Sequence, residues 1–121
     1  SMHLANVLQD VPVLAIPGAL GSPDDAGSNG VAAKGWWGSI IPSIWSYCLA
    51  ERSRGLGTAW TTLHLGDEAT DAEALGIPAT VTQLACIPTA FHTGVEFKPA
   101  TRKPAEQVTY WNTWKDTDIT S

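Results

Sequence analysis

The sequence predicts a mixed α+β fold. An apolar stripe with helical spacing lies in the middle of the chain, and short apolar runs that stop at prolines lie on either side of it. Helical and strand-like segments alternate with short connections, which favours a mixed architecture over an all-α or all-β one. At 121 residues, with 44% hydrophobic and 16% charged residues, the chain is expected to form a single domain over residues 1–121 with its own core.

The first strand-like run extends from Val11 to Ile16. It is apolar on both alternating faces and stops at Pro17-Gly18, which predicts a short strand buried on both sides. Residues 18–35 follow and are rich in Gly, Ala, Ser, Asp and Asn. This composition is typical of turns, and we expect a flexible loop here.

The central stripe predicts the main helix. Its apolar residues recur at three- and four-residue steps: Trp37, Ile41, Ile44, Trp45, Cys48 and Leu49. Such spacing puts the apolar side chains on one face, which we expect to lie in the core. Ser39 suits the helix start, Pro42 would then fall in the first turn, and Gly55 suits a left-handed closing position. The helix is therefore expected to run from Ser39 to about Arg54.

Strands and a short helix are predicted next. The run Thr58–Leu63 has strand-forming residues. An acidic segment from Gly66-Asp67 to Leu75 reads as a short helix that Gly76 ends. The apolar run Val81–Ile87 predicts a further buried strand that stops at the following proline.

The C-terminal third is expected to be less regular. Residues His92 to Pro104 contain two prolines, a glycine and three basic side chains, which predicts an irregular basic loop. The aromatic segment Val108–Trp114 is extended in character, and residues 115–121 are expected to form a frayed tail. Four short strands would leave a sheet edge that needs a partner.

Composition excludes several classes of partner. The net charge of −5 and the low isoelectric point argue against nucleic acid and anionic membrane surfaces. The apolar runs fall short of the ~20 residues that a membrane span needs, and no basic segment leads into an apolar run at the start, so a cytoplasmic location is expected. Two cysteines and three histidines without ligand spacing predict buried thiols and no metal site.

Common catalytic motifs are absent, but four other short motifs occur in order. There is no nucleophile elbow, phosphate loop, paired-histidine helix or dinucleotide glycine fingerprint. The chain instead carries RSRGLGT at 52–58, WTTLH at 60–64, LGIP at 75–78 and FKPATRKP at 97–104. With this order and spacing, the chain from about Val11 to Trp114 resembles the C-terminal portion of the nitroreductase family.

The resemblance implies a nitroreductase-like mixed sheet with flanking helices. That sheet would be incomplete, because the N-terminal part of the family's subunit, with its flavin-binding arginines, has no counterpart in this sequence. The implied activity is FMN-dependent transfer of hydride from NAD(P)H to a nitroaromatic or quinone-like small-molecule acceptor. The implied assembly is a homodimer, in which the aromatic residues Tyr110, Trp111 and Trp114 cover the neighbouring subunit.

The resemblance also suggests cofactor-binding residues. The segment of Thr61, Thr62, Leu63 and His64 would lie against the isoalloxazine ring. Arg102 would bind the flavin phosphate, which a planar guanidinium can grip through two oxygens. Lys98 and Lys103 would add positive potential.

Plainer interpretations of these residues stay open. Thr61 and Thr62 could be ordinary strand residues, His64 a surface or capping residue, and the basic segment a solvated loop. Trp36 and Trp37 would line the substrate channel in the family, or pack in a core or interface.

Three functions therefore remain. The chain could belong to an FMN-dependent oxidoreductase, it could be a truncated, non-catalytic dimerising or flavin-binding remnant, or it could store a flavin or nucleotide without turnover. The missing arginines leave open whether this chain is itself an enzyme.

Overall fold

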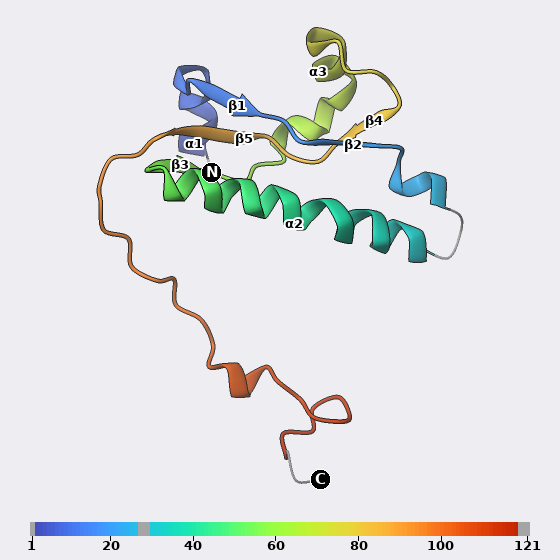
Figure 1. Ribbon diagram of the computed structural model, residues 1–121, viewed down its shortest axis with the longest axis vertical. Coiled ribbons are helices and arrows are strands. Elements are labelled where there is room, and N and C mark those ends of the chain that lie inside the picture. Colours follow the sequence, from blue (N-terminus) through green and yellow to red (C-terminus); the bar gives the residue numbers. More distant parts are fainter. Residues whose placement is uncertain (1, 27–29, 119–121) are drawn as a thin grey trace.

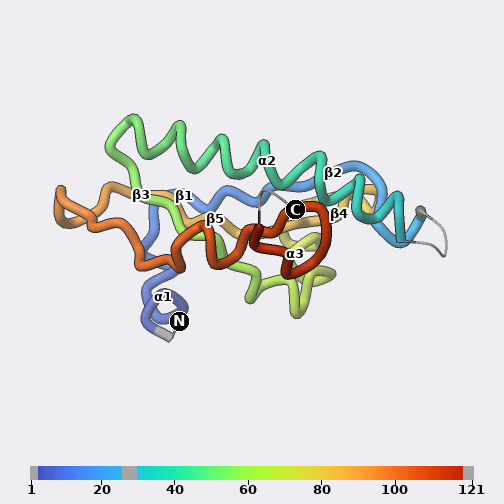
Figure 2. Tube along the Cα trace, turned by 90° about the horizontal axis from the view of Figure 1, so that it is seen from below, coloured from blue at the N-terminus to red at the C-terminus, as the bar shows by residue number. Residues whose placement is uncertain are grey.

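The computed structural model describes residues 2–26 and 30–118 and confirms a mixed α+β fold. Its helices are α1 (Met2–Val7), α2 (Val31–Ser53) and α3 (Glu68–Leu75). Its strands are β1 (Val13–Ala15), β2 (Gly18–Leu20), β3 (Leu56–Thr58), β4 (Val81–Gln83) and β5 (Ile87–Phe91). Figures 1 and 2 place α2 on one side of the strands and α1 and α3 on the other.

The strands form two small antiparallel sheets, ordered β1-β5-β3 and β2-β4. Ala15 pairs with Ile87, and Gly18 pairs with Gln83. Between these two pairs, the β1–β2 segment has two residues, 16 and 17, and the β4–β5 segment has three, 84 to 86. The β4–β5 segment therefore carries one extra residue, as in a β-bulge. The bulge lies within Leu84–Cys86. It divides the single strand that we predicted over Val81–Ile87 into β4 and β5.

Strand β5 continues through Pro88, where we had expected it to stop. The registers Thr58 with Thr89 and Thr61 with Cys86 belong to one antiparallel alignment. Between them the Ala59 amide donates to the Pro88 carbonyl at 3.3 Å, but proline has no N–H to return the bond. The hydrogen-bonded ladder is therefore interrupted at Pro88, and β3 ends at Thr58 instead of spanning the predicted Thr58–Leu63.

Helix α2 starts eight residues earlier than expected and ends close to the predicted point. Pro42 lies inside it instead of in its first turn, and its missing N–H leaves the carbonyl four residues earlier without the usual helical partner. The predicted end is confirmed, since Gly55 has the left-handed φ of 81° that favours glycine after a helix.

The segment 18–35 is more regular than the loop that we predicted. Strand β2, a 3₁₀ helix over Pro23–Ala26 and the first residues of α2 all fall within it. Residues 27–29 lie outside the described residues. The short acidic helix is confirmed as α3, and Gly76 follows it with a left-handed φ of 66°.

The core is small and lies between α2 and the β4–β5 segment. It consists of Ile44 and Cys48 from α2 packed against Leu84, Ala85 and Ile87 from the β4–β5 segment. Strand β1 contributes less than we expected: Val13 is 51% and Leu14 43% exposed. Successive residues of a strand point to opposite faces, so β1 is partly open on both faces, and the prediction that it is buried on both sides is wrong for the described chain.

The C-terminal arm, residues 93–118, leaves the body of the molecule (Figure 1). No side chain in it is buried. It is irregular except for a 3₁₀ helix over Ala105–Gln107, so the basic loop is as predicted. The aromatic segment Val108–Trp114 is not extended: it turns, and Tyr110 meets Trp114 edge-on at 4.8 Å. Residues 119–121 of the predicted frayed tail lie outside the described residues.

Candidate functional site

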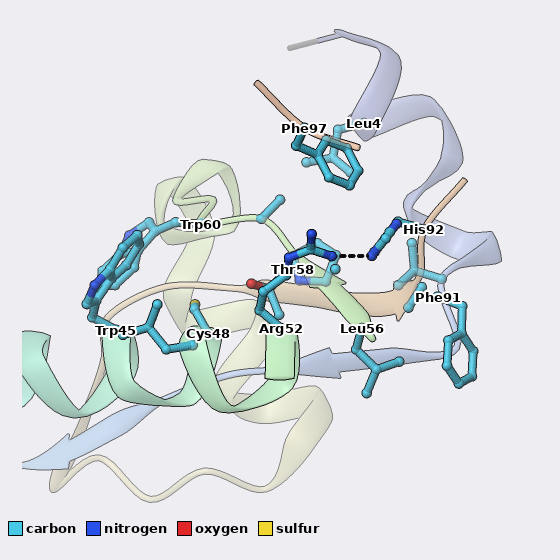
Figure 3. A pocket seen from close by; sticks show the side chains of 16 residues that line it. Leu4, Trp45, Cys48, Arg52, Leu56, Thr58, Trp60, Phe91, His92 and Phe97 are labelled. Atoms are coloured by element: carbon cyan, nitrogen blue, oxygen red, sulfur yellow. Dashed lines mark hydrogen bonds between the residues drawn. The ribbon is translucent and has the colours of Figure 1, made fainter. Parts of the chain in front are cut away.

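A pocket of about 570 Å³ lies where the end of α2 meets the edge of the β3–β5 ladder (Figure 3). Its volume is in the range of small-molecule sites. The lining is mainly apolar and aromatic: Leu4, Val11, Trp45, Cys48, Leu49, Leu56, Trp60, Pro88, Phe91 and Phe97 contribute most of it. Arg52 and His92 are its ionisable polar residues, and no carboxylate lines it.

Arg52 and His92 form the polar centre of the pocket. One Nη of Arg52 lies 2.7 Å from Nε2 of His92, and Nδ1 of His92 lies 2.7 Å from the Gly94 carbonyl oxygen. Arginine can only donate, so Nε2 accepts and Nδ1 carries the hydrogen that it donates to Gly94. His92 therefore orients the guanidinium.

Phe97 completes this cluster. Its ring centroid is 5.1 Å from the Arg52 guanidinium carbon, and it meets the His92 ring edge-on at 5.0 Å. A guanidinium over an aromatic face gains a cation–π attraction. Gly57 on β3 permits the arrangement, because a Cβ there would lie 3.3 Å from Cβ of His92.

The predicted flavin-facing residues lie elsewhere, on the segment between β3 and α3. The Thr61 hydroxyl donates to the Cys86 carbonyl at 2.9 Å, and Leu63 and His64 begin a 3₁₀ helix over Leu63–Asp67. Thr62 is exposed. Both ring nitrogens of His64 are buried and have no hydrogen-bond partner in the described part of the chain.

The predicted phosphate-binding residues lie on the C-terminal arm. Lys98, Arg102 and Lys103 are all exposed, and the side chain of Arg102 contacts only the carbonyl of the neighbouring Thr101, at 3.2 Å. Figure 1 shows that the arm carries them away from the body. Within one chain, the structure does not bring them together with Thr61–His64.

The predicted channel residues Trp36 and Trp37 belong to the first half of α2. The indole N–H of Trp36 donates to the Leu20 carbonyl at 3.2 Å, and the two indoles meet edge-on at 4.8 Å. Trp36 packs against the core, whereas Trp37 is exposed. Neither lines the 570 Å³ pocket.

The buried thiol of Cys86 has a shifted pKa. Burial raises the pKa of its thiol above the ordinary 9.0; a hydrogen bond with Thr61 opposes this, and the charge of Asp71 adds to it. The unfolded chain then loses the Cys86 proton at a lower pH than the folded chain. The free energy of unfolding should therefore be unaffected by this group below about pH 9 and fall as the pH rises further.

We expect Cys86→Ala to flatten this alkaline decrease. Urea unfolding midpoints between pH 7 and 10 measure it, and Cys48→Ala controls for the loss of a buried thiol. An equally steep decrease in Cys86→Ala would contradict the assignment.

The structure shows neither a metal site nor a membrane span among the residues it describes. No three His, Cys, Asp or Glu side chains there are grouped so that they could hold a metal ion. No helix in the same residues is both long and apolar enough to cross a bilayer.

Comparison with known proteins gives no relative: no family model matches the chain, and no curated protein or solved structure is significantly similar to it. The resemblance stated above therefore depends on the short motifs alone.

Sequence reasoning missed the Arg52–His92 pair. In the sequence, Arg52 is explained by the C-terminal end of the helix, where a basic residue complements the helix dipole, and His92 belongs to no recognisable motif. The pair is 40 residues apart in sequence and meets only because β5 pairs with β3, the strand that follows α2. The one local signal was the position of an arginine beside the glycine-rich turn at 55–57.

Proposed function

We propose that this chain is the C-terminal portion of an FMN-dependent, NAD(P)H-using oxidoreductase of the nitroreductase type, acting as a homodimer. The observation that carries the proposal is the C-terminal arm. It presents Lys98, Arg102 and Lys103 without carboxylate partners among the described residues, followed by a cluster of aromatic side chains. Phe97 at its start contacts Arg52 and His92, and no side chain beyond it is buried.

The large exposed surface supports the dimer. The accessible surface is 9173 Å², whereas a compact monomer of 12.8 kDa would expose roughly 6300 Å². The excess is roughly 2900 Å² per chain, or roughly 5800 Å² for two chains, which is at the upper end of the total area that obligate dimers bury.

Helix α2 supplies a suitable apolar face for the dimer. Its sequence has no charged residue from Gly35 to Ala50. Along this stretch Trp37, Ile41, Trp45 and Leu49 recur every four residues and are all exposed. The serine hydroxyls on the helix bond to its own carbonyls, as Ser43 does to Ile40 at 2.9 Å, so the face can lose water without leaving them unpaired.

In the dimer, we propose that the arm of one protomer crosses to its partner. Arg102 of one chain would then approach Thr61–His64 of the other, so that both halves of the flavin site come together. Arg102 has unused donors for a phosphate. His64 has two unpaired buried nitrogens that a polar ligand atom would satisfy.

These positions suggest a role for each group of residues. FMN, when bound, supplies the redox chemistry, taking hydride from NAD(P)H and passing it to a nitroaromatic or quinone-like acceptor. Arg102, with Lys98 and Lys103, would hold the phosphate end. The Thr61–His64 segment would orient the ring, and the neighbouring subunit would exclude water from it.

The deciding experiment is a visible absorption spectrum of the purified chain after incubation with FMN and desalting, alongside its mass in solution. A retained flavin band in a dimer supports the proposal, and bleaching of that band by NAD(P)H supports turnover. A retained band that NAD(P)H does not bleach favours flavin storage. A dimer without flavin favours the non-catalytic remnant.

We expect Arg102→Ala to weaken FMN binding by ~1.5–3 kcal/mol, the range for a charge-assisted hydrogen bond. Flavin fluorescence quenching measures the affinity. Arg54→Ala is the matched control, because Arg54 is an exposed arginine whose partner is Glu51, at 4.0 Å, and it should leave the affinity unchanged. Equal affinities in wild type and Arg102→Ala would remove Arg102 from the site.

A further inference from the structure

We infer that the 570 Å³ pocket beside Arg52 binds a small aromatic carboxylate. This goes beyond the proposed flavin site, because none of Thr61, Thr62, Leu63, His64, Lys98, Arg102 and Lys103 lines the pocket. The inference depends on the charge of Arg52, on its fixed orientation and on the aromatic lining.

The charge of Arg52 is not compensated in the described chain. No carboxylate lies within ion-pair distance of its guanidinium, whereas the nearby Glu51 pairs with Arg54 at 4.0 Å. The chain as a whole has a net charge of −5, whereas the pocket contains the positive charge of Arg52 and no carboxylate. An anionic ligand group would supply the missing partner.

The orientation of Arg52 is fixed by its neighbours. His92 accepts one of its hydrogen bonds, and the guanidinium lies over the Phe97 ring. Of the five N–H donors that an arginine carries, the structure occupies one. The others can bind both oxygens of a carboxylate, and less ordering is needed because the side chain is already held.

The rest of the pocket suits a flat apolar body. Figure 3 shows Trp45 and Trp60 at one end and the Arg52–His92 pair beyond them, with Phe97 and Leu4 on the far side. Aromatic walls favour stacked or edge-on rings. A ligand with one carboxylate on a one- or two-ring body matches both the charge and the lining.

The test is calorimetric titration of the purified chain, without FMN, with 2-naphthoate and with its uncharged isostere 2-naphthamide. We expect naphthoate to bind about tenfold or more tightly than the amide, as for a charge-assisted contact. Arg52→Gln should abolish this preference by weakening naphthoate alone. Arg54→Gln, which changes an exposed arginine outside the pocket, should leave both affinities unchanged.

Equal affinity of the two compounds for the wild type would overturn the inference, as would a preference that survives Arg52→Gln or is lost equally in Arg54→Gln. Absence of naphthoate binding would also overturn it. Affinity that falls as the protein concentration rises would show that a second copy of the chain fills the pocket instead. If Arg52→Gln does not fold, as judged by circular dichroism, the wild-type comparison of the two compounds still decides. Trp45 and Leu49 line the pocket and also belong to the proposed dimer face, so naphthoate is titrated at protein concentrations below the dimer Kd. Flavin binding is measured separately, so either proposal can then fail alone.

Discussion

The Ile41→Lys variant is expected to be monomeric under conditions in which the wild-type chain is a dimer. Ile41 lies in the middle of the exposed stripe of α2, with Trp37 one turn before it and Trp45 one turn after. A lysine there would be buried without a partner charge when two stripes meet. An unpaired buried charge costs about 3 kcal/mol or more, which raises the dimer Kd by roughly a hundredfold or more.

Light scattering over a range of protein concentrations measures this change. Ala74→Lys is the control, because it adds the same charge to an exposed position of α3 and should leave the mass unchanged. If Ile41→Lys remains dimeric, the interface lies elsewhere. If the wild type is itself monomeric at high concentration, the proposed assembly is wrong.

The Ile87→Ala variant is expected to lose about 2–5 kcal/mol of the free energy of unfolding, as is typical for a fully buried isoleucine. Ile87 is 0% exposed and packs in the one cluster that joins α2 to the β4–β5 segment. Because a domain of this size is stabilised by only about 5–15 kcal/mol, the loss would leave a substantial unfolded fraction.

Urea unfolding followed by circular dichroism tests this second prediction. Leu75→Ala on α3 removes a side chain that is 58% exposed, and it should change the stability by less than about 0.5 kcal/mol. Similar losses in the two variants would mean that Ile87 does not belong to a tightly packed core.

The ends of α2 and α3 were predicted more accurately than the strands, whereas α1 was not predicted. The apolar stripe and Gly55 located the end of α2 correctly, and Gly76 did the same for α3, because a left-handed glycine is a local signal. The start of α2 was missed because Pro42 was interpreted as a first-turn residue. Local sequence does not reveal that packing outweighs a lost hydrogen bond within a helix.

Strand boundaries depended on pairing that local sequence does not contain. Pro88 reads as a strand end, yet β5 continues through it because Thr89, Ala90 and Phe91 pair with β3. The apolar character of β1 was interpreted as burial on both sides, whereas Val13 and Leu14 remain exposed in the described chain.

Only some residues of the candidate sites could be predicted from the sequence. The basic loop was recognised, and the structure places it on the exposed C-terminal arm, which contacts the body through Phe97. The Arg52–His92 pair was not recognised, because its two members come together through sheet register. A polar pair assembled from elements 40 residues apart leaves no spacing pattern in the sequence.

The interruption at Pro88 also bears on how the pocket can move. Because Pro88 returns no hydrogen bond to Ala59, the ladder between β3 and β5 has a gap of one hydrogen bond between its two stretches, where the Ala59 amide alone donates to the Pro88 carbonyl at 3.3 Å. A continuous ladder opens only by unzipping from an end, whereas a ladder with a gap can bend at the gap while both stretches stay closed. Trp60 lies directly at this gap and forms part of the pocket wall. We therefore expect the pocket wall at Trp60 to be displaced more easily than the strand pairing that holds Arg52 and His92 in place.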